Sequence, residues 1–447
     1  MKKKILCAFL CAAMATTMLA GCGKKTEAGG TAEDGGKVLN IYVWNNEWRE
    51  RVEQNYPGYE KISDEEGKIG DVQVKWTTNP NEQGVYQNKL DEALMNQDKA
   101  AADEKIDIFL IEADYALKYI DSKYTLTMAD IGLEDSVFAD QFQYTKDVVT
   151  DANGKIKGSS WQACSGAMIY RRDMAKEVLG SDDPAEVQKA VSDWDKFLET
   201  ADKMKAKGYK MVSSVNDTYR VFSNNTTSKW VEDGKTDINI DPSIKKWIEM
   251  SKKMVDNKQC DTFGQWGDDW KKGFYMTGDV FCYFGPAWLV DFCMAVNEDG
   301  SVGKAGNWGL TAGPQGFYWG GTWICACSGT DNKTLVADII KKMTTDEQIL
   351  TDIVKKNGDC VNSDKVLTKF ANDTTFGQSY LGGQNPYPIL LSFVKKIDLS
   401  NQCKYDQACT EEMQGQMKNY FDGNATYDEA LEAFYKAVGE RHPELAK

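Results

Sequence analysis

The amino-acid sequence predicts an α/β fold made of two domains. Strand-like and helix-like segments alternate over residues 39–111, which is typical of a parallel sheet covered by helices. The chain has 447 residues, and a chain of this length normally divides into more than one hydrophobic core.

The first segments predict the sheet and place its functional edge. Strands are rich in β-branched and aromatic residues, and the helices show apolar residues three and four apart. Ligands of such sheets bind beyond the carboxyl ends of the strands, where the polar stretches 45–47 and 112–115 lie. The expected elements are strand 39–44 (LNIYVW), a helix from Glu47 to the Pro57-Gly58 stop, strand 72–76, helix 85–95 and the apolar strand 106–111 (IDIFLI).

The rest of the chain predicts a second block of strands and helices. A strand ends in the Gly-Pro-Ala-Trp turn at 285–288, and no internal repeat is present. The expected elements are the extended segment 155–172, helices 191–207 and 244–257, strand 279–284, the extended segments 308–313 and 318–328, and helices 336–343, 347–355 and 427–438.

The N-terminus predicts export and anchoring. Three lysines precede an apolar run at residues 5–20 that is too short to span a membrane and suits an export signal. It ends in Leu-Ala-Gly before Cys22, which resembles the lipobox of bacterial lipoproteins. That resemblance implies cleavage after residue 21 and a lipid on Cys22. Residues 22–36 contain no large apolar side chain and are expected to be a flexible tether.

Composition excludes several function classes. The net charge is −15, which disfavours binding to nucleic acid. The single histidine, His442, lies five residues from the end of the chain, a poor place for a Ser-His-Asp, Cys-His or histidine-metal site. Nine cysteines follow Cys22 without a repeated C-x-x-C, so neither a metal nor another cofactor is expected. Glycosidase chemistry, which needs only two carboxylates, is compatible with this composition.

Together these motifs resemble the extracellular solute-binding proteins of carbohydrate importers, the group that includes the maltose-binding protein. The most specific segments are the lipobox, GAMIYRRDMAKE (166–177), VFCYFGPAW (280–288) and GGTWICACSG (320–329). The resemblance implies a two-lobed periplasmic-binding-protein fold with a ligand cleft between discontinuous lobes. It also implies two kinds of partner: a carbohydrate, with an oligosaccharide expected, and the permease subunits of an ABC importer. The protein would be held on the outer face of the cell membrane by its lipid.

The same resemblance implies lobe boundaries. Residues 1–21 are the signal peptide and 22–36 the tether. Residues 37–163 and 317–358 form lobe 1, and 164–316 and 359–447 form lobe 2. The chain is expected to cross between the lobes near 162–166, 313–317 and 357–364.

Carrying the family over by position gives a candidate cleft. Aromatic rings cover the apolar faces of a sugar, and carboxylates, amides and arginine bind its hydroxyls. Ile111 stands where the maltose-binding relatives carry a tryptophan, so maltose itself is not assigned. The candidate contacts are Asn45, Glu47, Asp114, Trp161, Gln162, Asp217, Arg220, Trp266, Trp288, Trp319, Trp323 and Gln384. Trp288 and Trp323 are the strongest of them, because each follows a Gly-Pro or Gly-Gly turn.

Three other functions fit the same pattern. The first is a lipid-anchored glycosidase that uses two of Glu47, Glu112 and Asp114. The second is a surface adhesin that binds carbohydrate without a transporter. The third is a binding protein for a peptide or polyamine.

Overall fold

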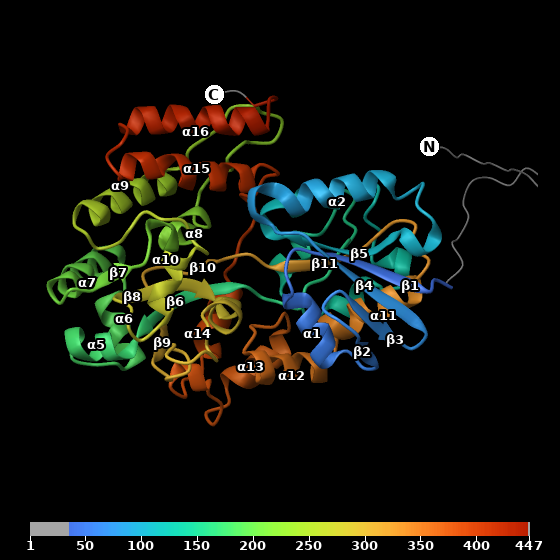
Figure 1. The fold of residues 1–447 in the computed structure, drawn as a ribbon, viewed down its shortest axis with the longest axis horizontal. Helices are drawn as coiled ribbons and strands as arrows, with labels where there is room; N and C mark the ends of the chain where they lie inside the picture. The colour runs from blue at the N-terminus through green and yellow to red at the C-terminus, as the bar shows by residue number, and fades with distance from the viewer. Residues whose placement is uncertain (1–34, 446–447) are drawn as a thin grey trace, which may run out of the picture. The chain divides into compact units, whose positions relative to one another are not determined.

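The computed structural model describes residues 35–445. The predicted signal segment, Cys22 and nearly all of the tether lie outside the described residues. Helices surround two separate β-sheets (Figure 1). Within residues 35–445, none of the helices has the length and apolar character needed to cross a membrane.

The first sheet has six strands in the order β11-β5-β1-β4-β3-β2. Its centre is parallel, as predicted, because β1 pairs with both β4 and β5 in that sense. The hairpin β2–β3 at one edge was not expected from the sequence. The strands are β1 (Val38–Val43), β2 (Tyr59–Lys61), β3 (Glu66–Ile69), β4 (Val72–Thr78), β5 (Ile106–Glu112) and β11 (Thr322–Ala326).

The second sheet is mainly antiparallel. β6 pairs antiparallel with β8, β9 and β10, and only β7 runs parallel to its neighbour, β8. Every residue of β6 and β8 is buried, so both strands are covered on both faces. The strands are β6 (Ser165–Arg171), β7 (Lys210–Val212), β8 (Val280–Pro286), β9 (Trp308–Thr311) and β10 (Phe317–Tyr318).

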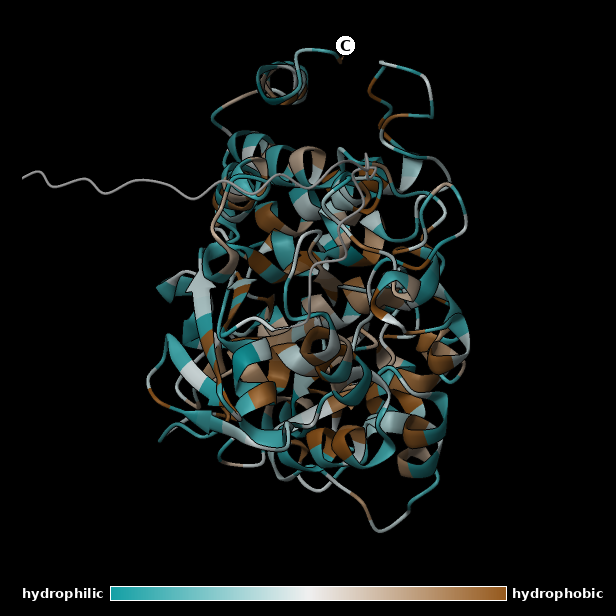
Figure 2. Ribbon diagram, turned by 90° about the vertical axis from the view of Figure 1, so that its right-hand side faces the viewer, coloured by the Kyte–Doolittle hydropathy of each residue, from teal (hydrophilic) through white to brown (hydrophobic). Residues whose placement is uncertain are grey.

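The helices bury one face against these sheets. In Figure 2 most of them carry both brown and teal residues, as expected of helices that are half in contact with a core. The principal helices are α1 (Glu47–Asn55), α2 (Val85–Asn96), α3 (Ala116–Ile120), α4 (Gln143–Asp147), α5 (Arg172–Leu179), α6 (Pro184–Ala190), α7 (Trp194–Ala206), α8 (Tyr219–Ser223), α9 (Pro242–Asp256), α10 (Asp268–Lys271), α11 (Lys333–Thr345), α12 (Glu347–Asn357), α13 (Asp364–Ala371), α14 (Tyr387–Val394), α15 (Asp406–Phe421) and α16 (Tyr427–Arg441). A π-helical turn, Leu289–Cys293, follows β8.

Three chain segments connect the two sheets, and they lie side by side. The segment before β6 bonds to the one before α13: Ala163 N–H donates to the Cys360 carbonyl, and Asn362 N–H donates to the Trp161 carbonyl, both at 2.7 Å. The segment between β10 and β11 joins them, because Trp319 N–H donates to the Cys164 carbonyl at 3.0 Å. These bonds hold the start of β6, the end of β10 and the segment before α13 together.

The second connection lies later than the sequence predicted. We expected the chain to return to the first sheet at 313–317, but β10, at Phe317–Tyr318, still pairs with β6 of the second sheet. The connection is therefore the Trp-Gly-Gly stretch at 319–321, where both glycines have positive φ values of 70° and 117°. Left-handed backbone of this kind favours glycine. The assignment of whole lobes to the expected ranges stays a prediction.

Candidate ligand-binding cleft

Glu47 begins α1, directly after β1, and points into the connections. Asn45 Oδ1 accepts the Glu47 N–H at 3.0 Å. The Glu47 side chain is buried, and its Oε1 accepts a hydrogen bond of 2.7 Å from Gln162 Nε2. Burial raises the pKa of Glu47 to about 8, and only Arg51 and Gln162 oppose that shift. The Glu47 carboxyl group, at the end of β1, and the Gln162 amide, in the segment before β6, are thus hydrogen-bonded to each other away from solvent.

Arg51, one turn further along α1, joins three parts of the chain. Its Nε and Nη2 bind Asp359 at 2.8 and 2.9 Å, and Nη2 also lies 3.5 Å from Asp291 Oδ2. Asp359 belongs to the third connection and Asp291 to the π-helical turn after β8. Trp161 Nε1 donates to Asp359 Oδ2 at 3.1 Å. With Glu47 4.0 Å away, one guanidinium serves three carboxyl groups.

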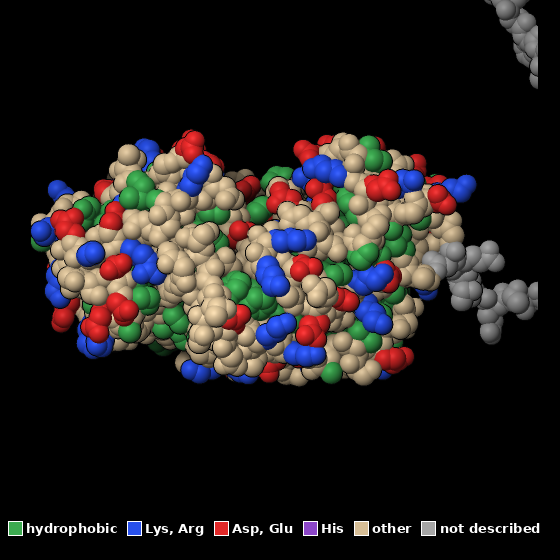
Figure 3. Space-filling view, turned by 90° about the horizontal axis from the view of Figure 1, so that it is seen from below, with side chains coloured by type: hydrophobic (Ala, Val, Ile, Leu, Met, Phe, Trp, Pro, Cys, Tyr) green, Lys and Arg blue, Asp and Glu red, His purple; other side chains and the backbone are tan. Residues whose placement is uncertain are grey.

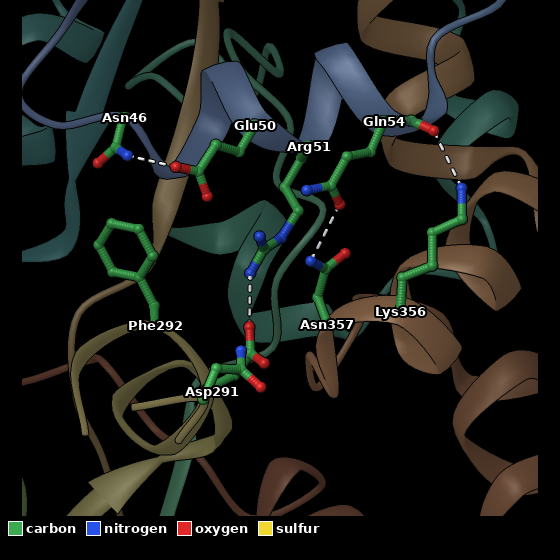
Figure 4. Close-up of a pocket in the computed structure, with 9 residues that line it drawn as sticks. Asn46, Glu50, Arg51, Gln54, Asp291, Phe292, Lys356 and Asn357 are labelled. Atoms are coloured by element: carbon green, nitrogen blue, oxygen red, sulfur yellow. Dashed lines mark hydrogen bonds and ion pairs between the residues drawn. The ribbon is translucent and has the colours of Figure 1, made fainter. Parts of the chain in front are cut away.

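A cavity of about 710 Å³ opens beside this arginine. Figure 4 shows Glu50, Arg51 and Gln54 reaching into it from α1, opposite Asp291 and Phe292 of the second sheet's π-helical turn. Asn357 and Lys356, at the end of α12, close one side, where Asn357 Nδ2 donates to Gln54 Oε1 at 3.1 Å. This polar cavity was not predicted from the sequence. Its further lining residues are Asn46 and Asn297.

A second acidic cluster lies at the end of β5. Arg220 on α8 holds Asp114 with two bonds, Nη1–Oδ1 at 2.8 Å and Nη2–Oδ2 at 2.5 Å. Glu112 Oε2 accepts the Asp114 N–H at 2.8 Å. Burial, followed by the Asp114 charge, raises the pKa of Glu112 to about 8. The arginine therefore links the first sheet to the helices of the second, at a point lined by carboxyl groups.

Three tryptophans form an aromatic group next to these acids. The rings of Trp266 and Trp288 are 24° from parallel with centroids 6.4 Å apart, and Trp319 lies 5.6 and 5.2 Å from them. The guanidinium of Arg220 lies 6.0 Å from the Trp319 ring. Trp266 is 38% exposed and has a φ of +75°, a strained value for a non-glycine residue that is often found at binding sites.

Gly320 places the aromatic group and Glu112 against each other. A Cβ at this residue would lie 3.6 Å from Glu112 Oε1 and 3.6 Å from Trp288 Cζ2. The Glu112 carboxyl group and the edge of the Trp288 ring thus border the same small space, which is open because Gly320 has no side chain. An apolar face beside hydrogen-bonding groups suits an amphipathic ligand.

Four of the predicted contact residues lie elsewhere. Trp161 and Trp323 are 0% and 1% exposed, and Trp323 Nε1 donates to the Thr145 carbonyl at 2.7 Å, so both rings belong to the core beneath the connections. Asp217 is buried and accepts Trp270 Nε1 at 2.6 Å, and burial raises its pKa to about 6. Gln384 binds the Leu310 N–H and carbonyl at 2.9 and 2.7 Å, at β9. These contacts give all four a structural role.

The remaining predicted residues are brought together. Asn45, Glu47 and Gln162 meet at the connections. Asp114, Arg220, Trp266, Trp288 and Trp319 meet beyond β5. Sequence reasoning missed Arg51, Asp291 and Asp359. Of these only Arg51 left a signal, because it follows Glu47 by four residues on the expected helix and therefore shares its face.

The cysteines of the described chain are unsuited to covalent chemistry. All nine are free thiols and only Cys293 is partly exposed. Burial raises the pKa of Cys360 to about 12, and raises that of Cys164 as well, which suppresses the reactive thiolate. Within residues 35–445, no group of three or more His, Cys, Asp and Glu side chains could hold a metal ion.

Residues 63–365 match the model of the bacterial extracellular solute-binding protein family. No curated protein sequence matches the chain. Two similar solved structures come from bifidobacteria. The first is an ABC-transporter-associated binding protein of B. animalis subsp. lactis in complex with β-1,6-galactobiose: 18% identity, TM-score 0.67, 92% of this chain and 98% of that one covered. The second is the galacto-N-biose/lacto-N-biose I-binding protein of Bifidobacterium longum in complex with lacto-N-biose. Its identity is 13% and its TM-score 0.65, and the match covers 92% of this chain and 98% of that one.

Maltose-bound MalE3 from T. maritima is also similar: 17% identity, TM-score 0.62, 90% of this chain and 99% of that one covered. At these identities the likeness concerns the fold. It confirms the predicted two-lobed periplasmic-binding-protein fold, in which two α/β lobes are joined by crossing segments.

Proposed function

This chain belongs to the bacterial extracellular solute-binding protein family, and on that premise we propose that it captures a carbohydrate and delivers it to an ABC-type importer. The observation that carries the proposal is the meeting of Trp288 with Glu112 in front of Gly320. A sugar ring presents an apolar face and a polar rim, and this pair offers one partner for each. The similar solved structures hold galactobiose, lacto-N-biose and maltose, which supports the same ligand class here.

The proposed contacts fall into two groups, one beyond β5 and one at the connections between the sheets. Trp266, Trp288 and Trp319 would cover sugar faces. Glu112 and Glu47 would bind hydroxyl groups, with Gln162 holding Glu47 in place. The polar cavity beside Arg51 adjoins Glu47, so a ligand longer than one sugar ring could extend into it. A ligand that contacts both groups would be an oligosaccharide rather than a monosaccharide.

The experiment is a thermal-shift screen of the full-length protein with mono- and oligosaccharides, followed by calorimetric titration of each hit. A ligand that binds only the folded protein stabilises it by about 2.7 kcal/mol at a concentration of 100 times its Kd. We expect at least one oligosaccharide to raise the melting temperature. A panel in which only peptides or polyamines bind would refute the carbohydrate assignment.

We further propose that a lipid on Cys22 anchors the protein to the outer face of the cell membrane. The lipobox supports this, as does membership of an extracellular family. Cys22→Ser should leave the fold unchanged and release the protein from the membrane fraction. Alanine in place of Cys7, within the signal, is the control that should leave anchoring intact. Membrane retention of Cys22→Ser would refute the anchor.

The alternatives are a glycosidase and an adhesin. Asp114 is fully engaged by Arg220, which leaves Glu47 and Glu112 as the only candidate acid pair of the first hypothesis. Release of reducing sugar from a bound oligosaccharide would identify a glycosidase, and we expect none. Stimulation of sugar uptake in vesicles that contain the cognate permease would separate importer delivery from adhesion.

A further inference from the structure

We infer that the captured carbohydrate carries a positive charge, such as the protonated amine of an amino sugar, which Glu112 receives beside the Trp288 ring. This inference rests on the proposed carbohydrate function and narrows its ligand class. It is argued from the charges of the cleft, from one open carboxylate oxygen and from the neighbouring aromatic ring.

The first step is the charge balance around Arg220. Asp114 takes both of its terminal nitrogens. Glu112 and Asp406 also lie within electrostatic range of the arginine. One cation thus faces at least three carboxyl groups, and its hydrogen bonds are used by only one of them.

The second step is that Arg51 repeats this arrangement at the other end of the site. Asp359 occupies it with two bonds, and Glu47 and Asp291 remain as neighbours at 4.0 and 3.5 Å. Both arginines of the cleft are therefore committed before a ligand enters. Burial keeps protons on Glu47, Asp291 and Glu112 by raising their pKa to about 8, 7 and 8. A ligand that brings a cation can replace a proton at one of them, whereas a neutral ligand cannot.

The third step is the open position on Glu112. Its Oε2 accepts the Asp114 N–H, whereas no donor within residues 35–445 is hydrogen-bonded to its Oε1. That oxygen borders the space in front of Gly320. A protonated amine could donate to it there in a charge-assisted hydrogen bond, which is stronger than one from a neutral hydroxyl.

The fourth step is the ring beside this oxygen. Trp288 Cζ2 borders the same space in front of Gly320. The C–H groups of the sugar that carries the amine can pack against this ring, which offers an apolar surface beside the carboxyl group. The ring and the carboxyl group therefore suit the two parts of an amino sugar in one place.

The test compares sugars that differ only in carrying one amine in place of a hydroxyl on each ring. Glucosamine is paired with glucose, galactosamine with galactose, mannosamine with mannose, and the β-1,4-linked glucosamine disaccharide with cellobiose. Each pair is titrated calorimetrically into the full-length protein at pH 6.5. We expect the amino sugar of at least one pair to bind at least tenfold more tightly than its neutral counterpart.

Two variants locate the effect. Glu112→Gln keeps an oxygen for the Asp114 N–H and removes the ionisable group. It should weaken the amino sugar at least tenfold and weaken its neutral counterpart by a clearly smaller factor, because an amide still binds hydroxyl groups. Glu186→Gln removes one partner of an exposed ion pair within α6 and should change neither affinity. Thermal melts confirm that both variants are folded, and Glu47→Gln provides a second test at the Arg51 end.

Each outcome decides one question. Equal affinities within every binding pair, or binding of neutral oligosaccharides alone, would overturn the charged-ligand inference and leave carbohydrate capture standing. Failure of every amino sugar would overturn it too. Binding of spermidine, with no sugar of either kind bound, would support the cation site and refute carbohydrate capture.

Discussion

Asp114 and Arg220 form a two-bond ion pair that joins the end of β5 in the first sheet to α8, which packs beside the second. Their side chains are 9% and 16% exposed, so solvent screens the pair only partly. Removing one partner of a buried pair leaves an uncompensated charge, which typically costs about 3–5 kcal/mol. Since the pair bridges the two halves of the fold, breaking it should change how they close on each other.

Asp114→Asn should shift the unliganded protein towards more open conformations. The arginine would keep Glu112 and Asp406 as neighbours but lose its two-bond partner. Small-angle scattering should then give a larger radius of gyration than for the wild type, and ligand should restore the compact profile at a higher concentration. The control is Glu186→Gln, which removes an exposed ion pair within α6. Superimposable profiles for Asp114→Asn and the wild type would contradict a bridging role.

Trp288→Ala and Trp323→Ala should have opposite effects. Trp288 is partly exposed beside Gly320, so its loss should weaken ligand binding at least tenfold, about 1.4 kcal/mol, with little change in the melting temperature without ligand. Trp323 is fully buried, so its loss should destabilise the fold by about 3–5 kcal/mol. Calorimetric titration and thermal melts of the same preparations separate the two. Normal stability of Trp323→Ala would show that its ring is not part of the core.

These two tryptophans also show what local sequence could predict. Both follow glycine-containing turns, and on that signal both were expected in the cleft. Trp323 instead lies inside β11, which pairs with β5 and turns the ring into the core. Which face of a strand is buried depends on its partner strand. Here the partner lies more than 200 residues away, so the residues around Trp323 do not indicate that its ring is buried.

The parallel strands were predictable for the opposite reason. β1, β4 and β5 have strong apolar patterns and short helical connections, so pattern alone identified the central sheet. The network around Arg51 was not predictable, because its partners Asp291 and Asp359 lie 240 and 308 residues away in the chain. Tertiary structure alone brings these residues together.

The folded protein should become less stable as pH rises. Burial raises the pKa of six carboxyl groups above their ordinary values: to about 6 for Asp107 and Asp217, about 7 for Asp291 and Asp406, and about 8 for Glu47 and Glu112. The folded state then binds more protons than the unfolded state between about pH 4.5 and pH 8, so the free energy of unfolding falls across this window. Melting temperatures without ligand should decline from pH 5.5 to pH 8.5.

The double variant Glu47→Gln, Glu112→Gln should flatten that decline, because it removes the two groups with the highest pKa. Exposed Glu186→Gln should leave the slope unchanged. A melting temperature that rises through the same window would mean that these carboxyls are ionised and compensated in the folded protein.

Gly320→Ala should block the ligand rather than the fold. The backbone at Gly320 has a φ of +70°, so any side chain there is strained by about 1–2 kcal/mol. Gly383 has a φ of +86°, and a Cβ added to it would meet no atom within 4 Å, which makes Gly383→Ala a control with comparable backbone strain outside the cleft. The methyl group of Gly320→Ala would lie at ordinary contact distance from Glu112 and Trp288, in the space proposed for the sugar.

Both variants should therefore lose similar stability, but only Gly320→Ala should lose ligand affinity, by at least tenfold in calorimetric titration. Unchanged affinity in Gly320→Ala would place the ligand elsewhere, and an equal loss in Gly383→Ala would show that strain and not blockage is responsible.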